Sequence, residues 1–186
     1  MKVFINPGHS PNGDPDPGAV NRQADLRECD LALGVGKKVQ YYLEQAGCLT
    51  KLLQSDNLMG EGVGPCVTET ANDWGADLFV SIHCNASNGD ARGTEVLCFA
   101  VDGAGSRLAL CIDKRLAMNI QAIDRAFSNR GVKERPDLAV LRATKMPAVL
   151  IELAFIDNME DAWLLTNYPD EFARAVACGV TDYEGI

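Results

Sequence analysis

Short apolar runs that end abruptly in polar residues constrain the fold of this chain more than any other feature. The clearest is residues 78–82 (LFVSI), which follow Gly75-Ala76-Asp77 and are followed by His83. A continuous apolar run of this length, bounded by turn residues, predicts a strand that is buried on both faces of a parallel sheet. His83 would then lie at the carboxyl end of this strand. Ligands and chemistry gather in the crevice outside the carboxyl ends of such strands, so His83 is a candidate site residue.

Two further runs have the same form. Residues 3–5 (VFI) precede the turn Asn6-Pro7-Gly8-His9, and residues 148–151 (AVLI) end in Glu152. The chain has only 2 histidines, and both are predicted at strand ends. Because the carboxyl ends of parallel strands meet at one edge of a sheet, we expect the three polar side chains to converge there.

Segments with helical periodicity alternate with the predicted strands. The predicted helices cover residues 28–46, 67–74, 105–127, 158–165 and 169–180. The predicted strands cover residues 2–5, 48–53, 78–83, 93–100, 138–141 and 148–152, with a turn at 128–131. This alternation predicts a single α/β domain, with a mostly parallel twisted sheet of about six strands and helices on both faces. We expect the domain to span residues 1–180, and residues 181–186 to form a weakly structured tail or the start of a linker.

Composition excludes some partners. The 186 residues carry a net charge of −9, with 47% hydrophobic and 23% charged residues. These values are typical of a globular protein and argue against binding a nucleic-acid backbone or an anionic membrane surface. We expect no membrane insertion, since no apolar run is long enough to cross a bilayer. The N-terminus has no signal-peptide pattern.

Cysteines are numerous but widely spaced. The chain has 7, an odd number without a CxxC pair, which does not fit a zinc ribbon or a disulfide framework. We expect buried free thiols that behave as small hydrophobic residues, in a protein kept in a reducing setting.

Two histidines and a carboxylate, with one position left for water, form the pattern of a catalytic zinc site. The HExxH motif is absent, so any such ligands come from distant segments. By spacing alone, the simpler interpretation of each histidine is a hydrogen-bonded polar residue near a strand end. Glu28, at the start of a predicted helix, is equally explained by the positive end of the helix dipole.

Several segments in order resemble a known family. They are NPGH (6–9), DPGA (16–19), RECDLAL (27–33), GADLFVSIHCNA (75–86), NRGVK (129–133), LAVLR (138–142) and PAVLIELAFIDN (147–158). In this combination they resemble the zinc-dependent N-acetylmuramoyl-L-alanine amidase catalytic domain of the amidase-3 type, which occurs in bacterial autolysins, sporulation amidases and phage endolysins. The resemblance covers nearly the whole chain.

The resemblance implies specific roles. His9, Glu28 and His83 would hold one Zn²⁺ per chain, and Glu152 would be the catalytic carboxylate. The expected reaction is hydrolysis of the amide bond between N-acetylmuramic acid and L-alanine in peptidoglycan, by a protein taken to be a monomer. Asn85 and Arg130 are candidate substrate contacts, although a turn-capping side chain and a solvated cation explain them equally well.

Two departures from the family pattern concern the substrate groove. Glu152-Leu153-Ala154-Phe155 stands where the family usually has Glu-Thr-Gly-Phe, and Glu69-Thr70 stands near a position where an arginine is common. The alternative enzyme is another zinc amidohydrolase or a carboxypeptidase-like peptidase that acts on stem peptides. A non-catalytic wall-binding module is a third interpretation, against which all four candidate site residues argue. The expected place of action is the bacterial cell wall, reached either by phage-lysin-type release or as an excised domain of a secreted protein.

Overall fold

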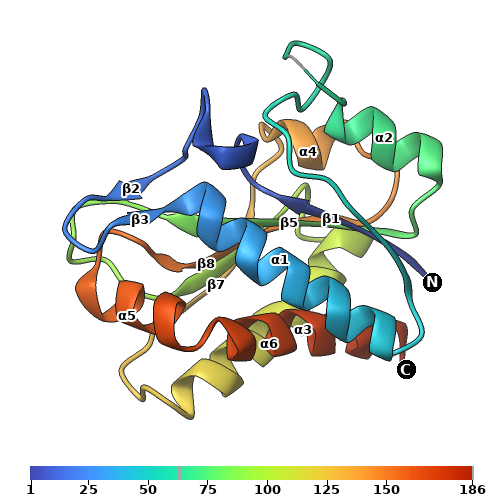
Figure 1. Cartoon of the computed structure of the whole chain (residues 1–186). Helices are drawn as coiled ribbons and strands as arrows, with labels where there is room; N and C mark the ends of the chain where they lie inside the picture. The colour runs from blue at the N-terminus through green and yellow to red at the C-terminus, as the bar shows by residue number, and fades with distance from the viewer. Residues whose placement is uncertain (63, 186) are drawn as a thin grey trace.

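A six-stranded sheet forms the centre of the molecule (Figure 1). The computed structural model describes residues 1–62 and 64–185. The sheet has the strand order β4-β1-β5-β8-β6-β7. Its strands are β1 (Lys2–Pro7), β4 (Leu49–Leu52), β5 (Leu78–Asn85), β6 (Thr94–Cys98), β7 (Asn129–Glu134) and β8 (Ala148–Phe155). Neighbouring strands are parallel except β6, which runs antiparallel to β8. The predicted fold class is therefore confirmed.

Helices cover both faces of the sheet. On one face lie α1 (Glu28–Gln45), α3 (Ala104–Gln121) and α6 (Pro169–Glu184), which pack over the larger hydrophobic core (Figure 1). On the other face, α2 (Val67–Trp74) and α4 (Ala139–Arg142) cover a smaller core around Phe4 and Phe79. The remaining elements are the 3₁₀ turn η1 (Pro11–Gly13), the short hairpin β2 (Val20–Asn21) and β3 (Leu26–Arg27), and α5 (Met159–Asn167).

Side chains alternate between the faces along each strand. In β5, Leu78, Val80 and Ile82 belong to the larger core. Phe79 points to the opposite face with the smaller core, and by the same alternation so does His83. Glu152 and Glu95, the successive register partners of His83, belong to this second face as well.

Two local predictions were wrong. Residues 138–141 form helix α4 with Leu138 as its N-cap, not a strand. A four-residue apolar run has no periodicity to separate the two states, and Ala, Leu and Arg favour a helix. Residues 128–131 were predicted as a turn, but Asn129 begins the edge strand β7. The register between β7 and β6 shifts near Gly131, whose φ is 77°. Such an irregularity lets the strand contain the turn-like sequence Asn129-Arg130-Gly131.

Strand and helix ends also differ from the predictions. β5 continues two residues beyond His83, and β8 continues three beyond Glu152, so both side chains project from inside a strand. Helix α3 ends at Gln121, short of the predicted 127. Helix α6 runs to Glu184, so residues 181–184 are helical where a weakly structured tail was predicted. Strands β5 and β8 and helix α6 are therefore longer than predicted, whereas α3 is shorter.

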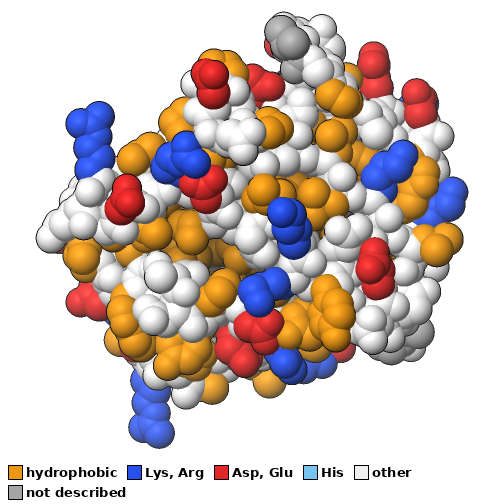
Figure 2. Space-filling view, viewed as in Figure 1, with side chains coloured by type: hydrophobic (Ala, Val, Ile, Leu, Met, Phe, Trp, Pro, Cys, Tyr) orange, Lys and Arg blue, Asp and Glu red, His pale blue; other side chains and the backbone are white. Residues whose placement is uncertain are grey.

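The surface over α1 and α6 carries interspersed acidic and basic side chains (Figure 2). Within residues 1–62 and 64–185, no helix combines the length and the apolar character that a membrane span requires. All seven cysteines are free thiols, and five of them are buried, as predicted; Cys111 is partly buried and Cys178 is exposed.

Candidate metal centre and active site

His9 lies in the turn that follows β1, with the backbone in the left-handed region at φ 67°. Its Nδ1 lies 2.7 Å from Asp16 Oδ2. This hydrogen bond fixes the ring and directs Nε2 toward Glu28. Nε2 lies 2.9 Å from Glu28 Oε1, yet it is buried and has no hydrogen-bonding geometry with any described partner. The turn therefore presents one buried, uncommitted imidazole nitrogen.

Glu28 is the first residue of α1 and is 4% exposed. Its Oε1 lies 3.0 Å from His83 Nδ1 and accepts a hydrogen bond of 2.9 Å from the Cys84 amide. Its Oε2 accepts one of 2.9 Å from the Ala19 amide. Burial would raise the pKa of the carboxyl, but the hydrogen bonds and charges of His83 and His9 outweigh burial and hold the pKa well below its usual range. Glu28 is therefore a carboxylate aimed at both histidines.

The three side chains form one donor set. The ligand atoms of His9, Glu28 and His83 all lie within 4.8 Å of one another. The family resemblance implied this set of residues, whereas periodicity and spacing did not single out Glu28. Burial opposes a charge on His9, but Glu28 and Asp16 overcome it and raise the pKa of His9 to about 9. Two imidazole nitrogens and one carboxylate oxygen, one nitrogen being buried without a hydrogen bond, fit a zinc ion that keeps an open position.

The backbone at two glycines passes very close to the side chains of the donor set. A β-carbon at Gly8 would overlap the His83 imidazole, and one at Gly18 would lie 2.5 Å from the His9 ring and 2.6 Å from Glu28 Oε2. Gly18 also has φ 69°, a conformation that other residues adopt at a cost. These two glycines leave the space in which the donor set assembles.

Glu152 lies beside the donor set. It is the register partner of His83 across β5 and β8, and of Glu95 across β8 and β6. Its Oε2 is buried and has no hydrogen-bond partner among the described residues. Burial raises its pKa to about 7; the nearby charges of Glu28 and Glu95 add to this effect, and that of His83 opposes it. A carboxyl group with a pKa near neutrality is suited to exchange protons with a reacting group.

Asn85 and Arg130 meet at a residue that sequence reasoning did not single out. Asn85 Nδ2 donates to Glu95 Oε1 at 3.0 Å, and Arg130 Nε donates to Glu95 Oε2 at 2.8 Å. Lys133 Nζ also donates to Glu95 Oε2. Both candidate substrate contacts therefore belong to one polar cluster next to Glu152.

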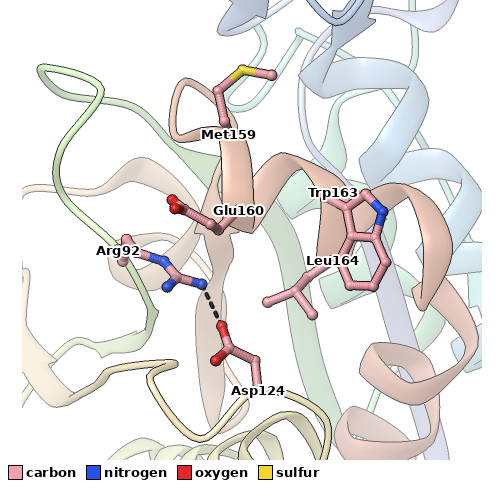
Figure 3. Close-up of a pocket in the computed structure, with 6 residues that line it drawn as sticks. All are labelled: Arg92, Asp124, Met159, Glu160, Trp163 and Leu164. Carbon is pink, nitrogen blue, oxygen red and sulfur yellow. Dashed lines mark hydrogen bonds and ion pairs between the residues drawn. The ribbon is translucent and has the colours of Figure 1, made fainter.

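A cavity of about 170 Å³ opens beside the donor set. Its polar lining residues include His9, His83 and Asp16, and its apolar lining residues include Leu58, Leu138 and Val140. A larger cavity of about 440 Å³ lies against α5 and shares no residue with the donor set (Figure 3). There Arg92 bridges Asp124 and the buried Asp161, at 2.6 and 2.9 Å. The charge of Arg92 is thus compensated by these two carboxylates.

This α/β domain carries a His-Glu-His donor set beside the carboxyl group of Glu152. A donor set of this kind next to an acid–base carboxyl group is typical of metal-dependent hydrolases. Residues 3–182 match the family described as N-acetylmuramoyl-L-alanine amidase (Amidase_3). The chain belongs to this family.

Individual relatives agree with this assignment. The chain is 35% identical to N-acetylmuramoyl-L-alanine amidase LytC of Bacillus subtilis (strain 168), over 97% of this chain and 35% of LytC. It is 34% identical to the endolysin of Bacillus phage SPP1, over 95% of this chain and 62% of the endolysin. The structure of N-acetylmuramoyl-L-alanine amidase AmiC2 of Nostoc punctiforme superposes with a TM-score of 0.84 at 31% identity, covering 100% of this chain and 98% of that one. The chain spans about a third of LytC and under two thirds of the endolysin.

Sequence reasoning missed three polar residues of the site, namely Asp16, Glu95 and Lys133. The DPGA segment contained Asp16, but nothing in its spacing linked it to His9. Glu95 lies in a predicted strand whose alternation places it on the face of Glu152, and that periodicity was the available signal.

Proposed function

We propose that His9 Nε2, His83 Nδ1 and a Glu28 oxygen hold one Zn²⁺ ion, and that Glu152 is the catalytic acid–base group. The observation that carries this proposal is the convergence of the three ligand atoms within 4.8 Å, with Glu152 in register beside His83. The proposed reaction is hydrolysis of the amide bond between N-acetylmuramic acid and L-alanine in peptidoglycan. The presence of every part of the site favours an enzyme over a wall-binding module.

A bound zinc ion would supply Lewis-acid chemistry, activating water and polarising a carbonyl group. Glu152, as a carboxylate, takes a proton from the attacking water. It then returns this proton to the departing amine of L-alanine, so that the bond between the carbonyl carbon and the nitrogen breaks with no net change in protonation of the enzyme. The Asp16 hydrogen bond holds the His9 ring in place through this cycle.

The cavity beside the proposed centre has no lining residue from β6 or β7, the strands that carry Glu95, Arg130 and Lys133. The apolar part of the cavity, formed by Leu58, Leu138 and Val140, would receive one side of the substrate. Asn85 and Arg130 are proposed to contact the other side. We take the protein to act as a monomer on the cell wall, which is also the place of action suggested by the names of its cell wall amidase and endolysin relatives.

Metal analysis after dialysis tests the ligand assignment. The wild-type protein is expected to retain about one zinc ion per chain. His83→Ala should retain none, whereas Glu152→Gln should retain as much as the wild type because Glu152 is not a ligand. Unchanged zinc content in folded His83→Ala, shown by circular dichroism, would contradict the assignment.

A further inference from the structure

We infer that Arg130 and Lys133, held on Glu95, form a subsite that binds a carboxylate of the stem peptide on the β7 side of Glu152. This inference rests on the proposed function, because it specifies which part of that substrate the site recognises. It assigns the class of stem chemistry that the enzyme prefers, namely a peptide whose second residue carries a free carboxylate.

Three acid–base side chains follow one another across the sheet. His83, Glu152 and Glu95 are successive register partners on β5, β8 and β6. Adjacent strands lie about 4.8 Å apart, so Glu95 stands one strand from Glu152 and two from His83. A substrate whose scissile bond lies between His83 and Glu152 therefore reaches Glu95 within a single residue's length.

Glu95 holds both cations of the cluster. Glu95 is 8% exposed, and it accepts hydrogen bonds from Asn85, Arg130 and Lys133. Burial alone would raise the pKa of its carboxyl, but Lys133 and Arg130 lower it. One buried carboxylate thus fixes two cations, and the cluster keeps a net positive charge.

Both cations keep side-chain N–H groups at the surface that can donate hydrogen bonds to a ligand. Their side chains are 37% exposed for Arg130 and 42% for Lys133. Of the three side-chain nitrogens of Arg130, only Nε makes a hydrogen bond to a described residue. The two terminal nitrogens are therefore available to a ligand. The guanidinium lies over the Phe155 ring at 4.9 Å, which fixes its plane. An oriented guanidinium with two free nitrogens matches a carboxylate.

The neighbouring Arg135 differs in this respect. Its Nε and one terminal nitrogen bind the two oxygens of Asp137 at 2.9 and 2.8 Å. Its fork is therefore occupied, and it does not offer the same geometry. The comparison singles out Arg130 and Lys133 as the available cations of β7.

The charge pattern sets the direction of the substrate. Asp16 and Asp56 line the cavity beside the donor set, together with apolar side chains, and neither β6 nor β7 contributes a residue to it. An anionic group is disfavoured there and favoured at Arg130 and Lys133. The acidic stem peptide therefore leaves Glu152 toward β7, and the muramoyl group faces the cavity beside α4.

Two substrates that differ in one group test this inference. They are N-acetylmuramoyl-L-alanyl-D-glutamate γ-methylamide, whose only carboxylate is the free α-carboxylate of its second residue, and the same compound with that α-carboxylate amidated. For the zinc-loaded wild type we expect kcat/KM to be about tenfold higher for the acid. The ratio should fall to about one in Arg130→Gln, fall several-fold in Lys133→Gln, and be partly restored in Arg130→Lys. The charge-matched control Lys114→Gln, on the exposed face of α3, should keep the wild-type ratio.

Binding provides a readout that does not depend on turnover. The same two compounds are titrated into Glu152→Gln, with and without Arg130→Gln, and the acid is expected to bind about tenfold more tightly only when Arg130 is present. Equal handling of both compounds by the wild type, or an equal loss for both in Arg130→Gln, would overturn the subsite while leaving the proposed function intact. Absence of cleavage of either compound by the wild type would contradict the proposed function, and the binding ratio would still decide the subsite.

Discussion

His83 and Glu152 are register partners on the adjacent parallel strands β5 and β8. Both strands are central in the six-stranded sheet and both are buried over most of their length. A proposed zinc ligand and the proposed proton carrier are therefore positioned by the backbone ladder rather than by a loop. Their separation is fixed before any ligand binds, which is the preorganisation that catalysis needs.

Replacing Glu152 by glutamine should abolish proton transfer while preserving shape. We expect kcat/KM to fall by about 10²–10⁴-fold, the range for loss of a general acid–base group, with zinc content unchanged. Steady-state assays and metal analysis on the same preparation check this. The control Glu160→Gln changes an exposed carboxylate on α5 and should be without effect. Turnover near the wild-type value in Glu152→Gln would remove Glu152 from the mechanism.

The raised pKa of Glu152 predicts a pH-dependent difference in stability. Burial moves its pKa from 4.5 to about 7, so the folded metal-free protein binds this proton more tightly than the unfolded chain. The stabilising contribution is complete below pH 4.5 and is lost as the pH rises through about 7. Glu152→Gln should therefore gain about 1–3 kcal/mol in free energy of unfolding, relative to the wild type, between these pH values. Urea titrations of both metal-free proteins at pH 4.5, 6 and 8 measure this, and a constant difference would contradict it.

Asp16 is expected to tune zinc affinity without touching the metal. Asp16→Asn replaces the acceptor opposite His9 Nδ1 by an amide that can turn a donor toward it, so the ring loses its fixed orientation. Loss of such a supporting hydrogen bond weakens metal binding by about 10–100-fold. Competition with a chelator measures the affinity, with Asp73→Asn on the exposed side of α2 as the control. Equal affinities in the two variants would show that Asp16 does not support His9.

Gly8 and Gly34 provide a matched pair of glycine substitutions. The methyl group of Gly8→Ala would overlap the His83 ring, whereas no atom lies within 4 Å of a β-carbon at Gly34. We expect Gly8→Ala to lose zinc binding. Gly34→Ala, within α1, should keep zinc and gain about 0.5–1 kcal/mol in stability from helix propensity. Thermal unfolding and metal analysis separate the effects, and normal zinc content in Gly8→Ala would contradict the described packing.

The central strands were predictable because each is a short apolar run that stops at a polar residue. His9, His83 and Glu152 stood out for this reason, and the structure places them together at the carboxyl edge. Glu28 did not stand out, because a carboxylate at a helix start already has an electrostatic explanation. Only the family resemblance assigned it to the donor set, where the structure also places it.

Other parts of the site depend on pairing that no local pattern encodes. The edge strand β7 pairs on one side only, so it does not need the apolar residues of a central strand. Its polar sequence therefore resembles that of a turn. Glu95 joins Asn85 and Arg130, which are 10 and 35 residues away in the chain. Such a cluster becomes visible only once the strand order is known.

Mass spectrometry of peptidoglycan digested by the zinc-loaded protein tests the central claim most directly. We predict release of stem peptides with free L-alanine amino termini, together with glycan that retains the lactyl carboxylate, and neither product from Glu152→Gln. Fragments cut within the stem peptide, or the same products from Glu152→Gln, would contradict the account.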